Sequence, residues 1–443
     1  MSRRLLLLGL FLLFLLGAAA CGGGDEEGTA TGGGTGTGGG AVECGSGEVS
    51  LMGIWVSTEQ KSIQAVLDGF EEKCPDIDVK YNGAGDNIVT VLATAVQGGN
   101  PPDLATIAQP GTIREYADRG EIKPLDFAKE TISANLPASA VELGTIDGTL
   151  YSFLFKGANK STVWYNVPLF EDAGVEPPED WDGFLDMAQT IKASGFPAYS
   201  IGGADGWTLT DLFENIYIRT AGPEKYDQLA THEIPWTDQS VKDALAEMAK
   251  ILGDTDNIAG GTQGALQTDF PTSVTNAFGD DPKGAMVLEG DFVAGEIINS
   301  TKSKAETGFN VFDFPSINGS APAVVGSGDQ VVMFNDTPAA QALVEYLASP
   351  EAAEIWVKLG GFSSPNTGVP PEAYPDPILR ETATALAEAE SFRFDLSDLQ
   401  PSAFGGTVGQ GLFKLFQDFL ANPDDVDGIA QQMEDAAAKA FKE

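Results

Sequence analysis

Short apolar segments alternate with longer amphipathic segments from residue 49 onward, and this order limits the folds that the chain can adopt. Residues 49–55, 78–81 and 103–107 have the composition of strands. Residues 59–73 and 88–96 repeat apolar side chains at helical spacing between those strands. A β-α-β-α-β order predicts a mainly parallel sheet flanked by helices.

A second series of similar segments fills residues 156–320. The chain has 443 residues, which is more than one hydrophobic core usually contains, so we predict an α/β fold of two lobes. Residues 324–334 have the pattern of a strand that returns to the first lobe. Further strands are expected at 285–288 and 308–314, and further helices at 181–193, 210–220, 240–252, 292–299, 338–348, 379–390, 411–421 and 425–441.

Residues 1–20 have the pattern of a signal peptide, in which Arg3 and Arg4 precede an apolar run and small residues follow it. The sequence Ala-Ala-Ala-Cys that ends at Cys21 resembles a bacterial lipobox, although Ala18 replaces the usual Leu. We therefore expect lipidation of Cys21, a flexible Gly- and Thr-rich tether over 21–47, and anchoring to the outer face of the cell membrane. A secreted protein with an incidental Cys21 is the alternative.

Export places the remaining cysteines, Cys44 and Cys74, in an oxidising compartment. Cys44 precedes the first strand, and Cys74 ends the helix that follows it. The helix of a strand–helix unit runs back along the sheet, so its end returns close to the start of the strand. We expect a disulfide between Cys44 and Cys74, with two free thiols as the alternative.

Composition excludes several classes of function. The formal charge of −40 repels nucleic acid and anionic lipid head groups. Three Cys and the single His232 are too few for a zinc or haem site of the usual kind, and a serine triad would have to use His232, which lies in a polar stretch. We expect no metal and no cofactor.

Four segments, in this order, resemble the extracellular solute-binding proteins of carbohydrate ABC importers, the group that includes maltose-binding protein. Residues 101–126 resemble the family's Pro-Asp strand, helix and Gly-x-x-x-Pro-Leu turn. Residues 147–192 contain an Asp-Gly-x-x-Tyr turn and a Trp-Tyr-Asn strand, and 284–292 (GAMVLEGDF) resemble the turn that enters the cleft. Residues 346–365 resemble the helix and loop before the last lobe crossing. The likeness covers most of 48–370.

The resemblance implies the type II periplasmic-binding-protein fold, with a hinge of several crossings and a ligand between the lobes. By analogy the crossings lie near 153–158, 323–328 and 361–366. The first lobe would comprise 48–154 plus 328–364, and the second 155–327 plus 365–443. The implied function is that of a monomeric binding protein, not an enzyme, which delivers a sugar or polyol to the permease subunits of an importer.

Five candidate ligand residues follow strands of the first lobe, where parallel α/β sheets bind ligands. Trp55, Thr58 and Glu59 follow the first strand, Asp86 the second, and Gln109 the third. A sugar presents hydroxyl groups at its edge, which these polar side chains can bind. Thr58 and Asp86 have helix capping as an alternative role.

Six more candidates come from the resemblance. Lys156 and Asn159 lie at the first crossing and Asp329 at the second, while Asp291 and Phe292 lie in the cleft turn. Trp207 follows a glycine-rich loop that we expect to be exposed, and it is the preferred stacking platform for a sugar face. Packing within a lobe is the alternative for Trp207, and the start of a helix is the alternative for Phe292. Trp164, Trp181 and Trp356 follow strand or helix periodicity and are expected in the core.

Two competing functions remain open from the sequence. A secreted glycosidase needs only two suitably placed carboxyl groups, which 65 acidic residues can supply. However, the sequence contains no Gly-x-Ser-x-Gly nucleophile motif and no phosphate-binding loop. A sensory or adhesive sugar-binding lipoprotein is the second alternative.

Overall fold

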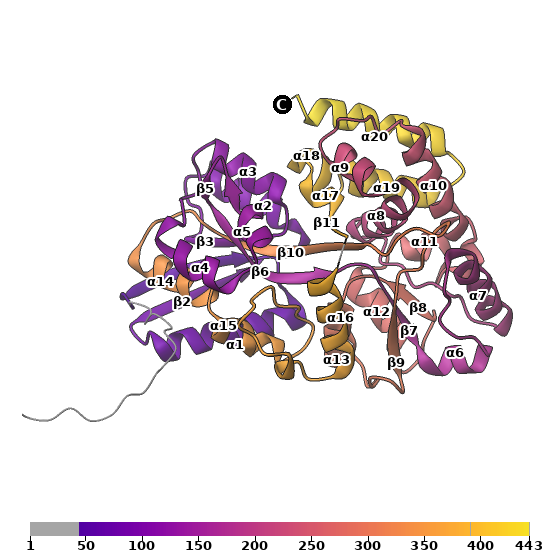
Figure 1. The fold of residues 1–443 in the computed structure, drawn as a ribbon, viewed down its shortest axis with the longest axis horizontal. Helices are drawn as coiled ribbons and strands as arrows, with labels where there is room; N and C mark the ends of the chain where they lie inside the picture. The colour runs from indigo at the N-terminus through magenta and orange to yellow at the C-terminus, as the bar shows by residue number, and fades with distance from the viewer. Residues whose placement is uncertain (1–43, 390, 443) are drawn as a thin grey trace, which may run out of the picture. The chain divides into compact units, whose positions relative to one another are not determined.

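The computed structural model describes residues 44–389 and 391–442 (Figure 1). The predicted signal peptide, Cys21 and nearly all of the predicted tether lie outside these residues. Among the residues that are described, no helix combines the length and the apolar character that a membrane crossing requires.

The larger sheet begins with three parallel strands: β1 (Gly47–Gly53), β2 (Ile77–Gly83) and β3 (Leu104–Ile107). β1 lies between the other two and pairs in parallel with both. Helices α1 (Ser57–Lys73) and α2 (Ile88–Gln97) connect the three strands. The predicted β-α-β-α-β order is therefore confirmed, and the segments that follow the strands lie at one edge of the sheet.

Helices cover both faces of this sheet. On one face, α1 packs with α14 (Pro338–Leu347) and α15 (Pro350–Val357), and their buried side chains include Phe70, Tyr346 and Trp356. On the other face, α2 packs with α3 (Pro110–Asp118). The apolar stripe predicted for α1 is buried in full, and each such side chain contributes about 1.5–3 kcal/mol to folding.

Two long antiparallel strands, β6 (Ser152–Asn159) and β10 (Val324–Met333), run between the two lobes (Figure 1). β10 pairs antiparallel with β3 at its end and parallel with β11 (Phe392–Phe394) at its start. The Gly157 amide also donates to the carbonyl of Ser363 at 2.7 Å. These three segments lie where the crossings were expected.

The smaller sheet differs from the prediction of mainly parallel sheets. Its order is β8-β7-β9, and β7 (Thr162–Asn166) is antiparallel to both β8 (Met286–Leu288) and β9 (Phe309–Asp313). In β1–β3 one helix connects each strand to the next one in the sequence and returns the chain in the same direction. A long, mostly helical stretch separates β7 from β8, so no local crossover sets their relative direction.

The second lobe surrounds the smaller sheet with helices, and α8, α10, α19 and α20 share its main buried cluster. Trp181 is buried in this cluster, and Trp164 and Trp356 are buried in the cluster that also contains the α1 side chains, so all three are in the core as predicted. The remaining elements are β4 (Thr145–Ile146), β5 (Thr149–Leu150), α4 (Lys129–Asn135), α5 (Ala138–Leu143), α6 (Val167–Ala173), α7 (Trp181–Ser194), α8 (Trp207–Ala221), α9 (Pro223–Ala230), α10 (Gln239–Leu252), α11 (Gly261–Ala265), α12 (Phe270–Phe278), α13 (Val293–Ser300), α16 (Pro377–Glu388), α17 (Leu396–Leu399), α18 (Ser402–Gly405), α19 (Gly411–Ala421) and α20 (Val426–Ala440).

Cys44 and Cys74 are joined by a disulfide, with their Cα atoms 5.3 Å apart. Gly47, which starts β1, also donates its amide to the carbonyl of Asp76 at 2.9 Å, just beyond the end of α1. The start of β1 and the end of α1 therefore meet at the edge of the sheet opposite to the ends of the parallel strands, as the strand–helix geometry predicts.

Candidate functional site

A cavity of about 230 Å³ lies beyond the carboxyl ends of β1–β3, between the two lobes. It is the place where a parallel α/β sheet binds ligands. Nine of the eleven predicted ligand residues line it: Trp55, Thr58, Glu59, Asp86, Gln109, Lys156, Trp207, Phe292 and Asp329. That these side chains contact a ligand stays a prediction.

The other two predicted ligand residues, Asn159 and Asp291, do not line the cavity. Along β6, Lys156 and Ala158 face the cavity, and alternation of side chains in a strand turns Asn159 the other way. Asn159 instead accepts the Ser161 amide at 3.0 Å, and its own carbonyl accepts the amide of Asp291. Asp291 accepts the hydroxyl of Ser363, so this pair ties the cleft turn to the crossing segments.

The first wall of the cavity consists of Trp55, Glu59, Lys156 and Asp329. The Trp55 indole donates to Asp329 Oδ2 at 2.7 Å, and Lys156 forms an ion pair with Glu59. Burial lowers the pKa of Lys156, but the negative charges of Glu59 and Asp329 outweigh that effect and raise it overall. Lys156 is therefore a charged ammonium group, and the neighbouring carboxylates already neutralise its charge.

Thr58 and Asp86 do not cap helices. The cap position of α1 is Val56 and that of α2 is Asn87, and neither helix start has a side-chain capping bond. Thr58 Oγ1 instead donates to Oε2 of Glu296 in α13 at 3.1 Å, a contact between α1 and α13. Burial raises the pKa of Asp86, and the indole of Trp207 opposes this shift.

Trp207 lies in a packed position, which corrects the prediction of an exposed loop. It is the first residue of α8, and the preceding Gly206 has a φ of 83° with no room for a side chain against Phe413. The indole packs against Phe270 and Phe292, with ring centroids 5.3 and 5.9 Å away. Trp207 is half-buried and still lines the cavity, so it is both a packing residue and a candidate platform.

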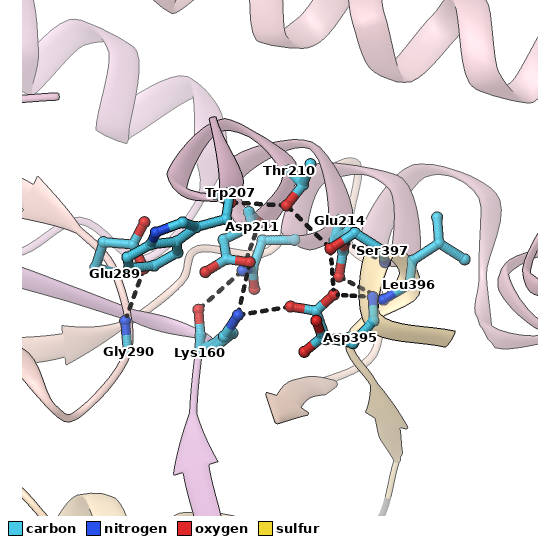
Figure 2. Close-up of polar contacts among 12 residues, drawn as sticks. Lys160, Trp207, Thr210, Asp211, Glu214, Glu289, Gly290, Asp395, Leu396 and Ser397 are labelled. Atoms are coloured by element: carbon cyan, nitrogen blue, oxygen red, sulfur yellow. Dashed lines mark hydrogen bonds and ion pairs between the residues drawn. The ribbon is translucent and has the colours of Figure 1, made fainter. Parts of the chain in front are cut away.

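Behind Trp207 lies the second wall, a buried group of charged side chains around Lys160 (Figure 2). The Lys160 ammonium lies 5.5 Å from the centre of the Trp207 ring. It contacts Asp211 Oδ1 at 2.9 Å and Asp395 Oδ2 at 2.6 Å. Three more buried carboxyl groups surround this pair, those of Glu214, Glu289 and Asp398.

Three of these groups, Asp211, Glu214 and Asp395, place carboxylate oxygens within 4.8 Å of one another. A cation can bridge oxygens at such a spacing. Here the Lys160 ammonium already contacts two of the three groups, and Tyr226 donates to the third at 3.0 Å. The cluster therefore has its own internal cation.

Asp205 adds a further carboxyl group to the cavity, close to Asp86 of the other lobe. It accepts the Phe270 amide at 2.6 Å. Burial raises the pKa of Asp205 to about 7, and the charge of Asp86 adds to this effect. The cavity lining thus contains more carboxyl groups than lysines, and both lysines are paired within the protein.

Comparison with known proteins places this geometry in a family. The family model for bacterial extracellular solute-binding proteins matches residues 55–354. The osmoprotective compounds-binding protein GgtB of Synechocystis sp. is 34% identical over 374 residues, which cover 82% of this chain and 87% of that protein. The alpha-glucosides-binding periplasmic protein AglE of Rhizobium meliloti is 31% identical over 382 residues, covering 82% and 81%.

The chain belongs to the bacterial extracellular solute-binding proteins.

Solved structures agree with this assignment at the level of the fold. A chitin oligosaccharide binding protein superposes with a TM-score of 0.77 at 21% identity, covering 90% of this chain and all of that one. The raffinose complex of the solute-binding protein RafE gives 0.72 at 20% identity, covering 89% and 100%. The solute-binding protein therefore has the two-lobed type II periplasmic-binding-protein fold, and its family consists of binding proteins.

Several residues that line the cavity of this solute-binding protein were not predicted from its sequence. Examples are Lys160, Asp205, Phe270, Asp395, Asp398 and Phe413. Side chains of an extended segment alternate between two faces, so the position of Lys160 on the same face as Lys156 could have been predicted from the sequence. Asp395 and Asp398 follow the short strand Phe392–Phe394, which contains too few residues for a periodic pattern.

Proposed function

We propose that this protein captures a small neutral sugar or related polyol between its lobes and delivers it to the permease of an ATP-driven importer. The observation that carries the proposal is the cavity, in which carboxyl groups of both lobes surround the aromatic rings of Trp207 and Phe292. Carboxylates accept hydrogen bonds from hydroxyl groups, and aromatic rings cover the C–H face of a sugar.

The charges of the cavity favour a neutral solute over an anionic one. Lys156 and Lys160 are each paired with carboxylates of the protein, so neither is free to neutralise a ligand anion. An additional buried negative charge would therefore be unpaired and costly. The volume of about 230 Å³ lies below the common range for drug-sized ligands and favours a small solute. The names of the relatives GgtB and AglE favour osmoprotective compounds and α-glucosides as the classes of ligand to test.

The location of the protein is a further part of the proposal. Cys21 follows a segment with the pattern of a signal peptide and precedes a Gly- and Thr-rich segment, a combination that supports a lipid anchor at the outer face of the membrane. The variant Cys21→Ser should leave the membrane fraction of the native host. Unchanged partitioning of this variant would contradict the anchor. The lobe boundaries, 48–154 plus 328–364 and 155–327 plus 365–443, also belong to the proposal.

A thermal-shift screen tests the function directly. A ligand at a hundred times its dissociation constant stabilises the folded protein by about 2.7 kcal/mol. We expect at least one α-glucoside, such as maltose or methyl α-D-glucopyranoside, to raise the melting temperature, while glucuronate and glucose 6-phosphate do not. No shift with any neutral sugar or polyol would contradict the proposal, and release of free glucose from maltose would favour a glycosidase.

A further inference from the structure

The second wall contains two neighbouring buried carboxyl groups, each with one oxygen that has no donor. Asp211 Oδ2 and Glu289 Oε1 are both inaccessible to water and lack a hydrogen-bond partner of their own. Glu289 is 3% exposed, and its other oxygen accepts only the adjacent Gly290 amide, at 3.3 Å. Asp211 is fully buried, and its other oxygen accepts a hydrogen bond from Lys160.

The remaining acidic groups of the cluster have donors of their own. Glu214 accepts from the Tyr226 hydroxyl and from the amides of Leu396 and Ser397. Asp395 accepts from Lys160, Ser397 Oγ and the Asp398 amide. Asp398 accepts from Gln109 of the first lobe at 3.0 Å. The missing donor is therefore confined to the contact between Asp211 and Glu289.

A proton between these two carboxyl groups supplies the missing donor. Lys160 is the one cation among the five carboxyl groups of this cluster and is already used by Asp211 and Asp395. An ionised, unpaired carboxylate at the position of Glu289 would be strongly destabilising, whereas a neutral acid can donate to Asp211. The side chains of Asp211 and Glu289 lie in hydrogen-bonding contact when one of them carries the proton.

We propose that Lys160 is a positioning residue for Trp207, and that its position depends on a proton shared between Asp211 and Glu289. The shared proton holds Asp211 in place, Asp211 and Asp395 hold the Lys160 ammonium, and that ammonium lies against the indole of Trp207 (Figure 2). This inference rests on the proposed function, because it gives Trp207 the role of the sugar platform.

The electrostatics support the shared proton. Burial raises the pKa of Glu289 well above its usual range, and the charge of Asp211 adds to that effect while Lys160 opposes it. Burial also raises the pKa of Asp211. The folded protein thus binds this proton more tightly than the unfolded chain does. Its contribution to stability is complete below the ordinary carboxyl pKa and is lost as the pH rises through the raised pKa of the folded state.

The experiment compares wild type, Glu289→Gln and the control Glu224→Gln from about pH 5 to about pH 9. Gln has the shape of a protonated Glu and keeps a donor for Asp211 at every pH. Glu224 is an exposed residue of α9, so its replacement makes the same chemical change on the surface, away from the buried cluster. Maltose affinity is measured by calorimetry, and the free energy of unfolding in urea is measured on the same samples without sugar.

We expect the maltose affinity of wild type to fall with rising pH, by at most about tenfold for each pH unit above the pKa of the shared proton. The Glu289→Gln variant should bind within about twofold of wild type at the acidic end and lose less affinity at the alkaline end. Glu224→Gln should follow wild type. When Trp207 is also replaced by Ala, the change of Glu289 to Gln should no longer alter the pH dependence of maltose affinity. The same change should still alter the pH dependence of the unfolding free energy.

Parallel affinity profiles for wild type and Glu289→Gln would overturn the positioning role, even if their stability profiles differ. Parallel stability profiles would overturn the shared proton itself. If Glu289→Gln does not fold, Asp211→Asn offers the same comparison, since its amide donates to Glu289 and still accepts from Lys160. If maltose does not bind, the neutral sugar with the largest thermal shift takes its place in the same comparison. Absence of binding by every neutral sugar and polyol would count against the proposed function, while the unfolding profiles would still decide the shared proton.

Discussion

The two walls of the cavity each place one buried lysine among carboxylates, but they differ in their access to water. In the first wall, Lys156 pairs with Glu59, whose side chain is 36% exposed. In the second wall, Lys160 pairs with Asp211 and Asp395, whose side chains are 0% and 1% exposed. Glu59 gives the first wall one partly hydrated carboxylate beside the buried Lys156 and Asp329, whereas the charged groups of the second wall are all buried and depend on one another.

This difference decides how the charges of each wall are stabilised. A partly exposed carboxylate such as that of Glu59 keeps much of its hydration beside Lys156. A buried carboxylate needs a cation or several donors, and the five acids around Lys160 exceed what one ammonium can neutralise. The Glu59 position of the first wall is therefore tolerant of substitution, and the second wall is a tightly linked group.

The largest difference between the walls should appear in stability. Asp395→Asn leaves the buried Lys160 with one carboxylate fewer, and we expect a loss of about 3 kcal/mol in the free energy of unfolding. Glu59→Gln in the first wall should cost at most about 1 kcal/mol, because Glu59 is partly hydrated. Urea unfolding of both variants measures this. Equal losses would show that the walls do not differ as described.

The next largest effect should appear in affinity. Trp207→Ala removes the indole from the second wall, and covering a sugar face against an indole stabilises binding by about 2 kcal/mol, or roughly thirtyfold. Trp207→Phe should retain much of the affinity. Calorimetry with maltose checks both, and urea unfolding shows whether the fold is intact. Binding as tight as wild type in Trp207→Ala would make Trp207 a packing residue and Phe292 the leading platform.

The smallest effect should come from the contact that joins the lobes beside the walls. Thr58→Val removes the hydrogen bond from Thr58 to Glu296, while Glu296 keeps the hydroxyl of Ser300 as a partner. We expect maltose affinity to fall by about 1 kcal/mol, or roughly fivefold, because one net hydrogen bond across the cleft is lost. The stability of the lobes should not change. Unaltered affinity would show that this contact does not contribute to closure.

The comparison also shows which parts of the site a sequence can reveal. In the first wall, Trp55 and Glu59 lie at a strand end of one β-α-β-α-β unit, so their position was predictable from local periodicity, whereas Lys156 and Asp329 came from the family resemblance. In the second wall, Lys160, Asp211 and Asp395 come from three distant segments that the fold brings together. No pattern in the sequence links such positions, and only the family resemblance pointed to this region, through Trp207 and Phe292.

The fold shows the same division. Long amphipathic helices such as α10 and α19 were predicted to within about a residue, because their own periodicity defines them. The antiparallel direction of β7 relative to β8 depends on pairing between distant segments, and the prediction was wrong there. Trp207 was expected to be exposed because glycines surround it, but those glycines allow close packing against Phe413 and Phe270.

Small-angle scattering tests the central claim, that one solute is held between walls of two different lobes. Wild-type protein is measured alone and with saturating maltose, or with whichever neutral sugar gives the largest thermal shift. A ligand that contacts both walls stabilises the closed arrangement, so the radius of gyration should decrease on binding. Identical scattering profiles at verified saturation would contradict capture between two closing lobes.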